Sequence, residues 1–152
     1  GPFTEEPPML TQWLMTPGDG AITEAQKDDL PAEFPRVHPE LDGNKHRYGY
    51  CLGTGSMVKP DFGRFVKYDF VKDSREVYEL PAHEFGAEPV FIPAANATSE
   101  DEGYLISFVY DQSTNGSSVQ ILNAQQITDG PIAKVMLPQR VPYGFHGSWV
   151  PA

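Results

Sequence analysis

The chain has 152 residues and a mass of 16.8 kDa, about one domain's worth of protein. Its 21 acidic residues outnumber its 11 basic ones, for a formal net charge of −10. A chain this acidic repels phosphate backbones, so we expect no nucleic-acid partner. Fifteen prolines and fourteen glycines favour many turns and few long helices.

The first residues indicate where the folded part begins, and the single cysteine bears on the compartment in which the protein lies. Residues 1–8 (GPFTEEPP) are proline-rich and acidic, and we interpret them as an N-terminal arm or a tag remnant, with residues 9–152 as the folded domain. Cys51 has no partner for a disulfide, and its ordinary role is that of a small buried apolar residue. The sequence has no signal-peptide pattern and no apolar run near the ~20 residues of a membrane span, so we expect a cytoplasmic protein.

Strand patterns dominate the chain from Leu10 onward. The segment 63–70 alternates apolar and polar side chains, which predicts a half-buried strand, and turns are predicted at 17–20 and 73–74. Short helices are predicted only around 23–29 and 123–127. The expected strands, in chain order, are 10–16, 21–25, 45–52, 63–70, 76–80, 88–92, 104–110, 118–122 and 133–137.

Three polar residues recur at nearly equal intervals along this series of strands. Glu33, Glu88 and His146 are 55 and 58 positions apart, and each opens a new group of about four antiparallel strands. This is the layout of a β-propeller, in which the innermost strands line a central channel. The spacing therefore predicts an all-β chain of about two and a half blades, with the three side chains converging on the axis. An ordinary β-sandwich with accidental spacing is the alternative.

A histidine and two glutamates that meet in a dry channel suggest a metal site. His146 is the expected ligand, and Glu33 and Glu88 are either direct ligands or acceptors for imidazole N–H groups, which orient a ligand histidine. The alternatives remain open. A histidine among aromatic residues is commonly a hydrogen-bonded core residue, and a glutamate beside a proline commonly caps a turn.

The remaining histidines and aromatic residues fit a site less directly. His38, His46 and His83 are expected at the surface or in loops, and no helical zinc motif, nucleophile elbow or phosphate loop is present in the sequence. Aromatic residues cluster near the proposed inner strands, and they line either an apolar substrate tunnel or the propeller core. Those selected for the tunnel are Phe91, Phe145 and Trp149.

Five segments resemble the C-terminal third of the carotenoid cleavage oxygenases, a family that includes the lignostilbene dioxygenases and the retinal-pigment-epithelium isomerase. They cover most of the chain in the family's order, and the last is the most specific. The segments are AEFPRV with HRYGY (32–37 and 46–50), GAEPVFIP (86–93), DEGYLISFVYD (101–111) and LPQRVPYGFHGSWV (137–150).

The resemblance implies a seven-bladed propeller with a non-haem ferrous ion, Fe(2+), held on the axis by four histidines, three of them backed by glutamates. His146 matches the last of these histidines, and Glu33 and Glu88 match two of the glutamates. The other three histidines of the family have no match in this chain, so we expect the chain alone to be inactive. Its implied partner is the remaining N-terminal blades, with peripheral membrane contact through segments outside this chain.

The implied reaction is cleavage of a conjugated C=C bond by O2 into two carbonyl products. The expected substrate is apolar and conjugated, a carotenoid or apocarotenoid, with a stilbenoid as the alternative. A different class of function also stays open: a non-catalytic β domain that kept the blade sequence for binding or assembly.

Overall fold

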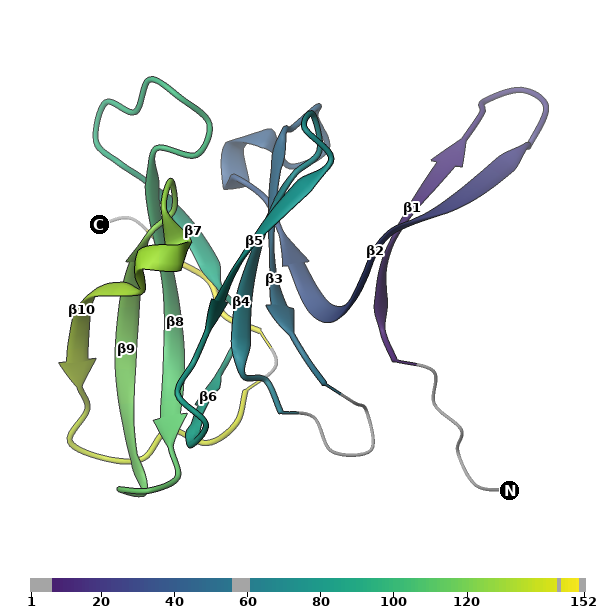
Figure 1. Ribbon diagram of the computed structural model, residues 1–152. Coiled ribbons are helices and arrows are strands. Elements are labelled where there is room, and N and C mark those ends of the chain that lie inside the picture. The colour runs from purple at the N-terminus through teal and green to yellow at the C-terminus, as the bar shows by residue number, and fades with distance from the viewer. Residues whose placement is uncertain (1–6, 56–60, 145, 151–152) are drawn as a thin grey trace, which may run out of the picture.

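The computed structural model describes residues 7–55, 61–144 and 146–150, and it consists of antiparallel strands joined by turns. The all-β class is confirmed (Figure 1). Only two short 3-10 turns occur among the described residues, so none of them forms a helix long enough to cross a membrane. The turns are η1 (Pro39–Leu41) and η2 (Ile127–Asp129).

The first sheet has the order β1-β2-β3-β4-β5. Its strands are β1 (Met9–Met15), β2 (Ile22–Arg36), β3 (Tyr48–Gly53), β4 (Arg64–Asp69) and β5 (Ser74–Glu79). The long strand β2 serves two neighbours, because its first half pairs with β1 and its last residues pair with β3. The β1–β2 hairpin consequently projects away from the rest of the molecule (Figure 1).

The second sheet has the order β10-β9-β8, with β6 and β7 both pairing with β8. Its strands are β6 (Glu84–Gly86), β7 (Val90–Pro93), β8 (Gly103–Asp111), β9 (Gly116–Asn123) and β10 (Pro131–Met136). Since β6 pairs near the end of β8 and β7 near its start, the two short strands occupy one side of β8 in succession. Gly86 permits a close approach here, because a Cβ atom would lie 2.9 Å from the Phe65 ring of the first sheet.

The core lies between the two sheets, and a second cluster lies on the other face of the first sheet. Most residues of both clusters are apolar residues at alternating strand positions. The first contains Tyr50, Leu52, Phe65, Leu80, Phe91, Leu105, Val109, Leu122, Ala124 and Ile127. The second contains Ala32, Cys51, Val66 and Tyr68, with Leu10 and Leu30 packed against it. Cys51 is buried as expected.

Three sequence predictions were wrong. The expected helix at 23–29 is part of β2, because the turn at 17–20 pairs Thr23 with Leu14 across the hairpin. The strand at 64–69 is buried on both faces rather than on one, since Lys67 forms a buried ion pair with Asp101. The expected helix at 123–127 is only the 3-10 turn at Ile127–Asp129.

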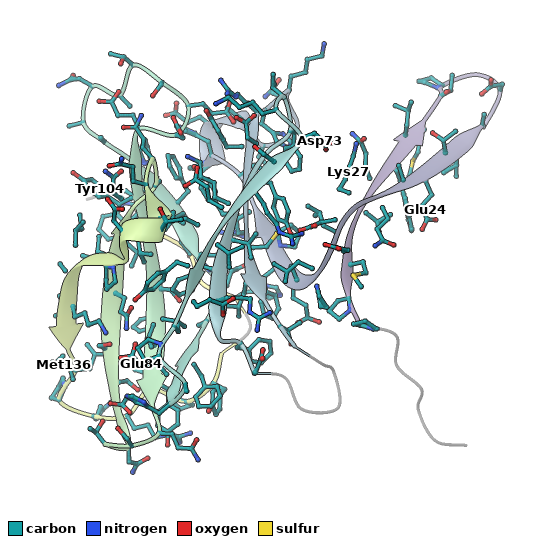
Figure 2. All side chains as sticks on the ribbon, viewed as in Figure 1. Glu24, Lys27, Asp73, Glu84, Tyr104 and Met136 are labelled. Carbon is teal, nitrogen blue, oxygen red and sulfur yellow. The ribbon has the colours of Figure 1, made fainter. Side chains whose placement is uncertain are left out.

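Large apolar side chains are exposed at both ends of the structure. The hairpin exposes Trp13, Leu14, Met15 and Ile22, and the edge strand β10 exposes Ile132, Val135 and Met136. In Figure 2, Glu24 on the hairpin and Met136 on β10 mark these two extremes of the molecule. Exposed apolar groups on strands with an unpaired edge are features that folded proteins normally cover.

Candidate metal centre

Glu88 lies at the centre of the candidate site, two residues before the start of β7. Its side chain is 3% exposed. One carboxylate oxygen, Oε2, accepts a hydrogen bond from the Gly147 backbone N–H at 2.8 Å. The other, Oε1, lies 3.3 Å from His146 Nδ1 and 3.7 Å from Arg36 Nε. The structure therefore brings together two of the three residues that the sequence spacing singled out.

His146 lies in the segment that follows β10, outside any strand, and its side chain is 74% exposed. The Phe34 ring contacts the imidazole edge-on, with ring centroids 5.5 Å apart and an interplanar angle of 83°. A carboxylate accepts hydrogen bonds, so in a neutral imidazole the Nδ1 that faces Glu88 carries the proton and Nε2 keeps its lone pair. This is how a metal-binding histidine is held, so His146 and Glu88 fit one ligand of a metal site and its orienting carboxylate.

Glu33 lies in β2, half-buried and opposite Leu52 of β3. No hydrogen bond or ion pair of the Glu33 side chain is present among the described residues. Its role beside a metal ligand therefore stays a prediction. Across the described ranges 7–55, 61–144 and 146–150, no group of three or more His, Cys, Asp or Glu side chains is arranged to hold a metal ion. The metal-binding role of His146 therefore stays a prediction as well.

The other three histidines have local roles. His38 Nδ1 accepts a hydrogen bond from the Glu40 N–H at the start of η1, at 3.2 Å, and its ring packs beside Phe91. His46 lies in the loop before β3 rather than in the strand. His83 lies in the turn before β6, 3.8 Å from Asp111.

The tunnel residues have different environments. Phe91 is buried and stacks on Tyr50, with centroids 5.3 Å apart, whereas Trp149 is exposed. Phe145 lies outside the described residues. Whether these rings line a substrate path stays a prediction.

Two neighbours of His146 were missed by the sequence interpretation, Phe34 and Arg36. Arg36 Nη2 donates to the Gly147 carbonyl oxygen at 3.2 Å, and Arg36 also faces Glu88. Both residues belong to the EFPR segment that contains Glu33. The signal available was Pro35, since a proline inside a strand indicates a bulge that redirects the adjacent side chains.

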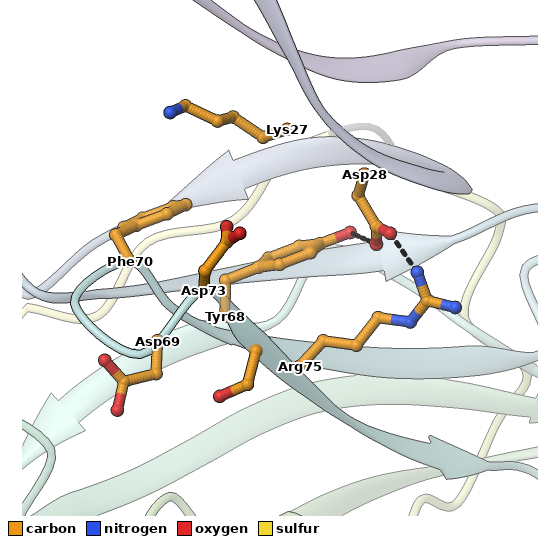
Figure 3. A pocket seen from close by; sticks show the side chains of 8 residues that line it. Lys27, Asp28, Tyr68, Asp69, Phe70, Asp73 and Arg75 are labelled. Atoms are coloured by element: carbon orange, nitrogen blue, oxygen red, sulfur yellow. Dashed lines mark hydrogen bonds and ion pairs between the residues drawn. The ribbon is translucent and has the colours of Figure 1, made fainter.

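A separate cavity of about 250 Å³ lies between the hairpin and the β4–β5 turn (Figure 3). Its polar groups largely pair with one another: the Tyr68 hydroxyl donates to Asp28 at 2.8 Å, and Arg75 binds Asp28 and Asp29. None of Glu33, Glu88 and His146 lines it. The candidate metal centre is therefore distinct from this cavity.

Comparison with known proteins relates the whole chain to one family. The family of the retinal pigment epithelial membrane protein matches residues 2–151. A carotenoid cleavage oxygenase of Mycobacterium tuberculosis is 35% identical over 99% of this chain and 31% of its own length. An apocarotenoid-15,15'-oxygenase of Synechocystis is 30% identical over 95% of the chain and 30% of its own length.

Solved structures give the same result for the fold. The structure of a Synechocystis apocarotenoid oxygenase variant superimposes with a TM-score of 0.90 and 28% identity, covering 97% of this chain and 31% of that one. A cobalt-substituted form of the same oxygenase also has a TM-score of 0.90. The chain thus spans about a third of the length of the relatives it matches. It belongs to the family of the retinal pigment epithelial membrane protein and the carotenoid cleavage oxygenases.

Proposed function

We propose that this chain forms the C-terminal part of a non-haem Fe(II) dioxygenase that cleaves a conjugated C=C bond of a carotenoid or apocarotenoid. The observation that carries this proposal is the buried Glu88 carboxylate, which faces Nδ1 of His146 and leaves Nε2 directed away from it. The relatives named as carotenoid and apocarotenoid oxygenases support the same chemistry.

In the proposed site His146 holds the metal through Nε2, and Glu88 fixes the orientation and tautomer of its ring. Glu33 orients a histidine that lies outside this chain. The cobalt-substituted Synechocystis oxygenase supports a divalent metal in the family. Ferrous iron, when bound, supplies open positions for O2 beside its histidine ligands. The chain's contribution is to hold one imidazole in a fixed direction.

The other ligands belong to the remaining N-terminal blades of a seven-bladed propeller, of which residues 9–152 form about two and a half. Support comes from the apolar surface at both ends of the structure. On the outer face of the second sheet, Phe108, Val119 and Val135 lie side by side in register across β8, β9 and β10. Phe108 and Val135 are about half exposed. Neighbouring blades would cover this row and the projecting hairpin.

The substrate in this proposal is a long apolar polyene that reaches the metal along aromatic side chains, among them Phe91, Phe145 and Trp149. A dry, apolar path suits such a molecule, because it offers no hydrogen-bond partners and gains from burial. The position of the path relative to the metal would select the double bond that is cleaved.

The test uses the complete protein, this chain joined to the preceding blades, purified and loaded with Fe(II). We expect about one iron per protein and O2-dependent conversion of an apocarotenoid into two carbonyl products, measured by metal analysis and product chromatography. Resveratrol run in parallel separates a stilbenoid-cleaving enzyme from a carotenoid-cleaving one. Absence of both iron binding and cleavage would leave the non-catalytic β domain as the better description.

A further inference from the structure

We infer that Arg36 is a positioning residue for His146, because it holds both the Glu88 carboxylate and the peptide that follows His146. This inference rests on the proposed function, in which His146 binds the metal. Arg36 Nε lies 3.7 Å from Glu88 Oε1, and Arg36 Nη2 donates to the Gly147 carbonyl oxygen at 3.2 Å. One guanidinium thus contacts both the carboxylate that faces His146 and the backbone of the residue that follows it.

The segment that carries His146 makes few other hydrogen bonds. Val141 N–H donates to Ser117 Oγ at 3.0 Å, where the segment leaves the second sheet. Beyond that point, the hydrogen bonds found in the described residues 142–144 and 146–150 are those of His146 and Gly147 with Glu88 and Arg36. Both hydrogen-bonding groups of the Gly147 backbone are therefore occupied, the N–H by Glu88 and the C=O by Arg36. The direction of the imidazole depends on these contacts.

Charge explains why an arginine is needed at this place. The Glu88 carboxylate is 3% exposed, and an ionised group out of water is costly unless a charge or several hydrogen bonds compensate it. His146 is neutral when it binds a metal, so it donates a hydrogen bond to Glu88 without a compensating charge. Among the described residues, the lysine or arginine that pairs with Glu88 is Arg36. Its planar fork reaches the carboxylate and the carbonyl at the same time, which a lysine cannot match.

The backbone of β2 is bent to present this side chain. The register between β2 and β3 shifts between Glu33 and Arg36, and Phe34 within that interval has a φ of +55°, in the left-handed region that bulky residues rarely adopt. The same bulge directs the Phe34 ring against the edge of His146. Strained backbone is often found where a fold must orient a functional side chain, and here the side chains are those of Phe34 and Arg36.

The experiment measures Co(II) binding to the complete protein by competition with a chelator, together with the visible d–d spectrum of the bound ion and the thermal midpoint. The variants are Arg36→Met and Arg36→Lys. The matched control is Arg75→Met, because Arg75 has nearly the same exposure, pairs with the carboxylates Asp28 and Asp29, and does not contact His146. We expect Arg36→Met to weaken Co(II) binding about 10–100-fold and to alter the d–d bands, as is typical when groups behind a metal ligand are lost.

Arg36→Lys keeps the charge that faces Glu88, so we expect it to recover part of the lost affinity, and it also serves if Arg36→Met does not fold. Arg75→Met is expected to bind Co(II) with the unmodified spectrum. Unchanged affinity and spectrum in both Arg36 variants would overturn the positioning role while leaving the proposed function intact. An equal loss in Arg75→Met would also overturn it, because the effect would then reflect general stability. An unmodified protein that binds neither Fe(II) nor Co(II) would overturn the proposed function and this inference together.

Discussion

Two buried carboxylates flank β7, and their surroundings differ in one respect. Asp101 follows the strand and pairs with Lys67 of the first sheet at 2.7 Å, with both side chains almost fully buried. Glu88 precedes the strand and is as well buried, but its partners Arg36 and His146 reach solvent. The Asp101 pair is closed, because both charges end inside the protein. The Glu88 pair is open, because it holds an imidazole whose second nitrogen is free to bind. Similar burial thus serves cohesion in one place and, in the proposed site, presentation of a metal ligand in the other.

The largest expected effect is at the open pair. Replacing His146 by Ala in the complete protein removes the proposed metal ligand, so we expect iron affinity to fall by more than the roughly 100-fold that loss of a supporting group causes. Metal analysis after gel filtration checks this, with His83→Ala as the control because His83 lies beside Asp111 and away from Glu88. Full iron content in His146→Ala would remove His146 from the ligand set.

Substitutions in the Lys67–Asp101 pair should change the stability of the protein rather than its metal binding. Lys67→Met leaves the Asp101 carboxylate buried without its cation, and breaking such a pair on one side costs about 3–5 kcal/mol. The double variant Lys67→Met/Asp101→Leu removes both charges, so we expect it to regain most of that free energy. Chemical denaturation of the three proteins measures the difference. A double variant as unstable as the single one would show that the ion pair is not the source of the loss.

Removing the charge of the Glu88 carboxylate should have the opposite effect: a large loss of metal binding and a small loss of stability. Glu88→Gln keeps the shape but loses the charge that faces Arg36 and His146, and we expect about 10–100-fold weaker metal binding with a smaller change in stability. Glu84→Gln is the matched control, since Glu84 pairs with Lys134 in the second sheet, and it should bind metal normally. The comparison between the two pairs fails if Glu84→Gln and Glu88→Gln lose metal equally.

Acid should weaken the closed pair. Burial alone raises the pKa of Asp101, but the hydrogen bond and charge of Lys67 outweigh it and hold that pKa below its ordinary value. A lowered pKa adds stability that is complete above the unfolded value of about 4 and disappears as the pH falls through the folded one. We therefore expect the thermal unfolding temperature to decrease when the pH is lowered below roughly 4. The decrease should be smaller in Lys67→Met, where that pairing is already lost. Equal acid sensitivity in both proteins would contradict this.

The smallest expected effect concerns the other face of the first sheet. Burial raises the pKa of the Cys51 thiol to about 12, so it stays protonated and unreactive at neutral pH. Alkylation followed by mass spectrometry of the peptide that contains Cys51 should show labelling only after denaturation. Rapid labelling of the folded protein would mean that the hairpin side of the sheet opens, and that close packing is confined to the side facing the second sheet.

Much of this arrangement could be predicted from sequence, and the exceptions have physical reasons. Alternating apolar residues predict most of the strands, and the regular interval along the chain links Glu88 to His146. The position of Arg36 depends on a bulge, which changes where a side chain points without changing the sequence period. The burial of Lys67 depends on Asp101, which belongs to a different group of strands, and no local pattern reveals such a pairing. The three-residue strand β6 is too short to show alternation.

The long strand β2 also bears on how such proteins exchange parts during evolution. Residues 22–26 and Pro31 pair with β1, whereas Ala32, Glu33 and Arg36 pair with β3, so this one strand joins the projecting hairpin to the rest of the first sheet. A crossover that separated the β1–β2 hairpin from strands β3 to β5 would have to cut β2 in its middle, and it would leave β1 and β3 each with an unpaired edge. Recombination among relatives is therefore expected to spare residues 22–36 and to join chains in the turn at 17–20, where the backbone is exposed and contributes to no sheet.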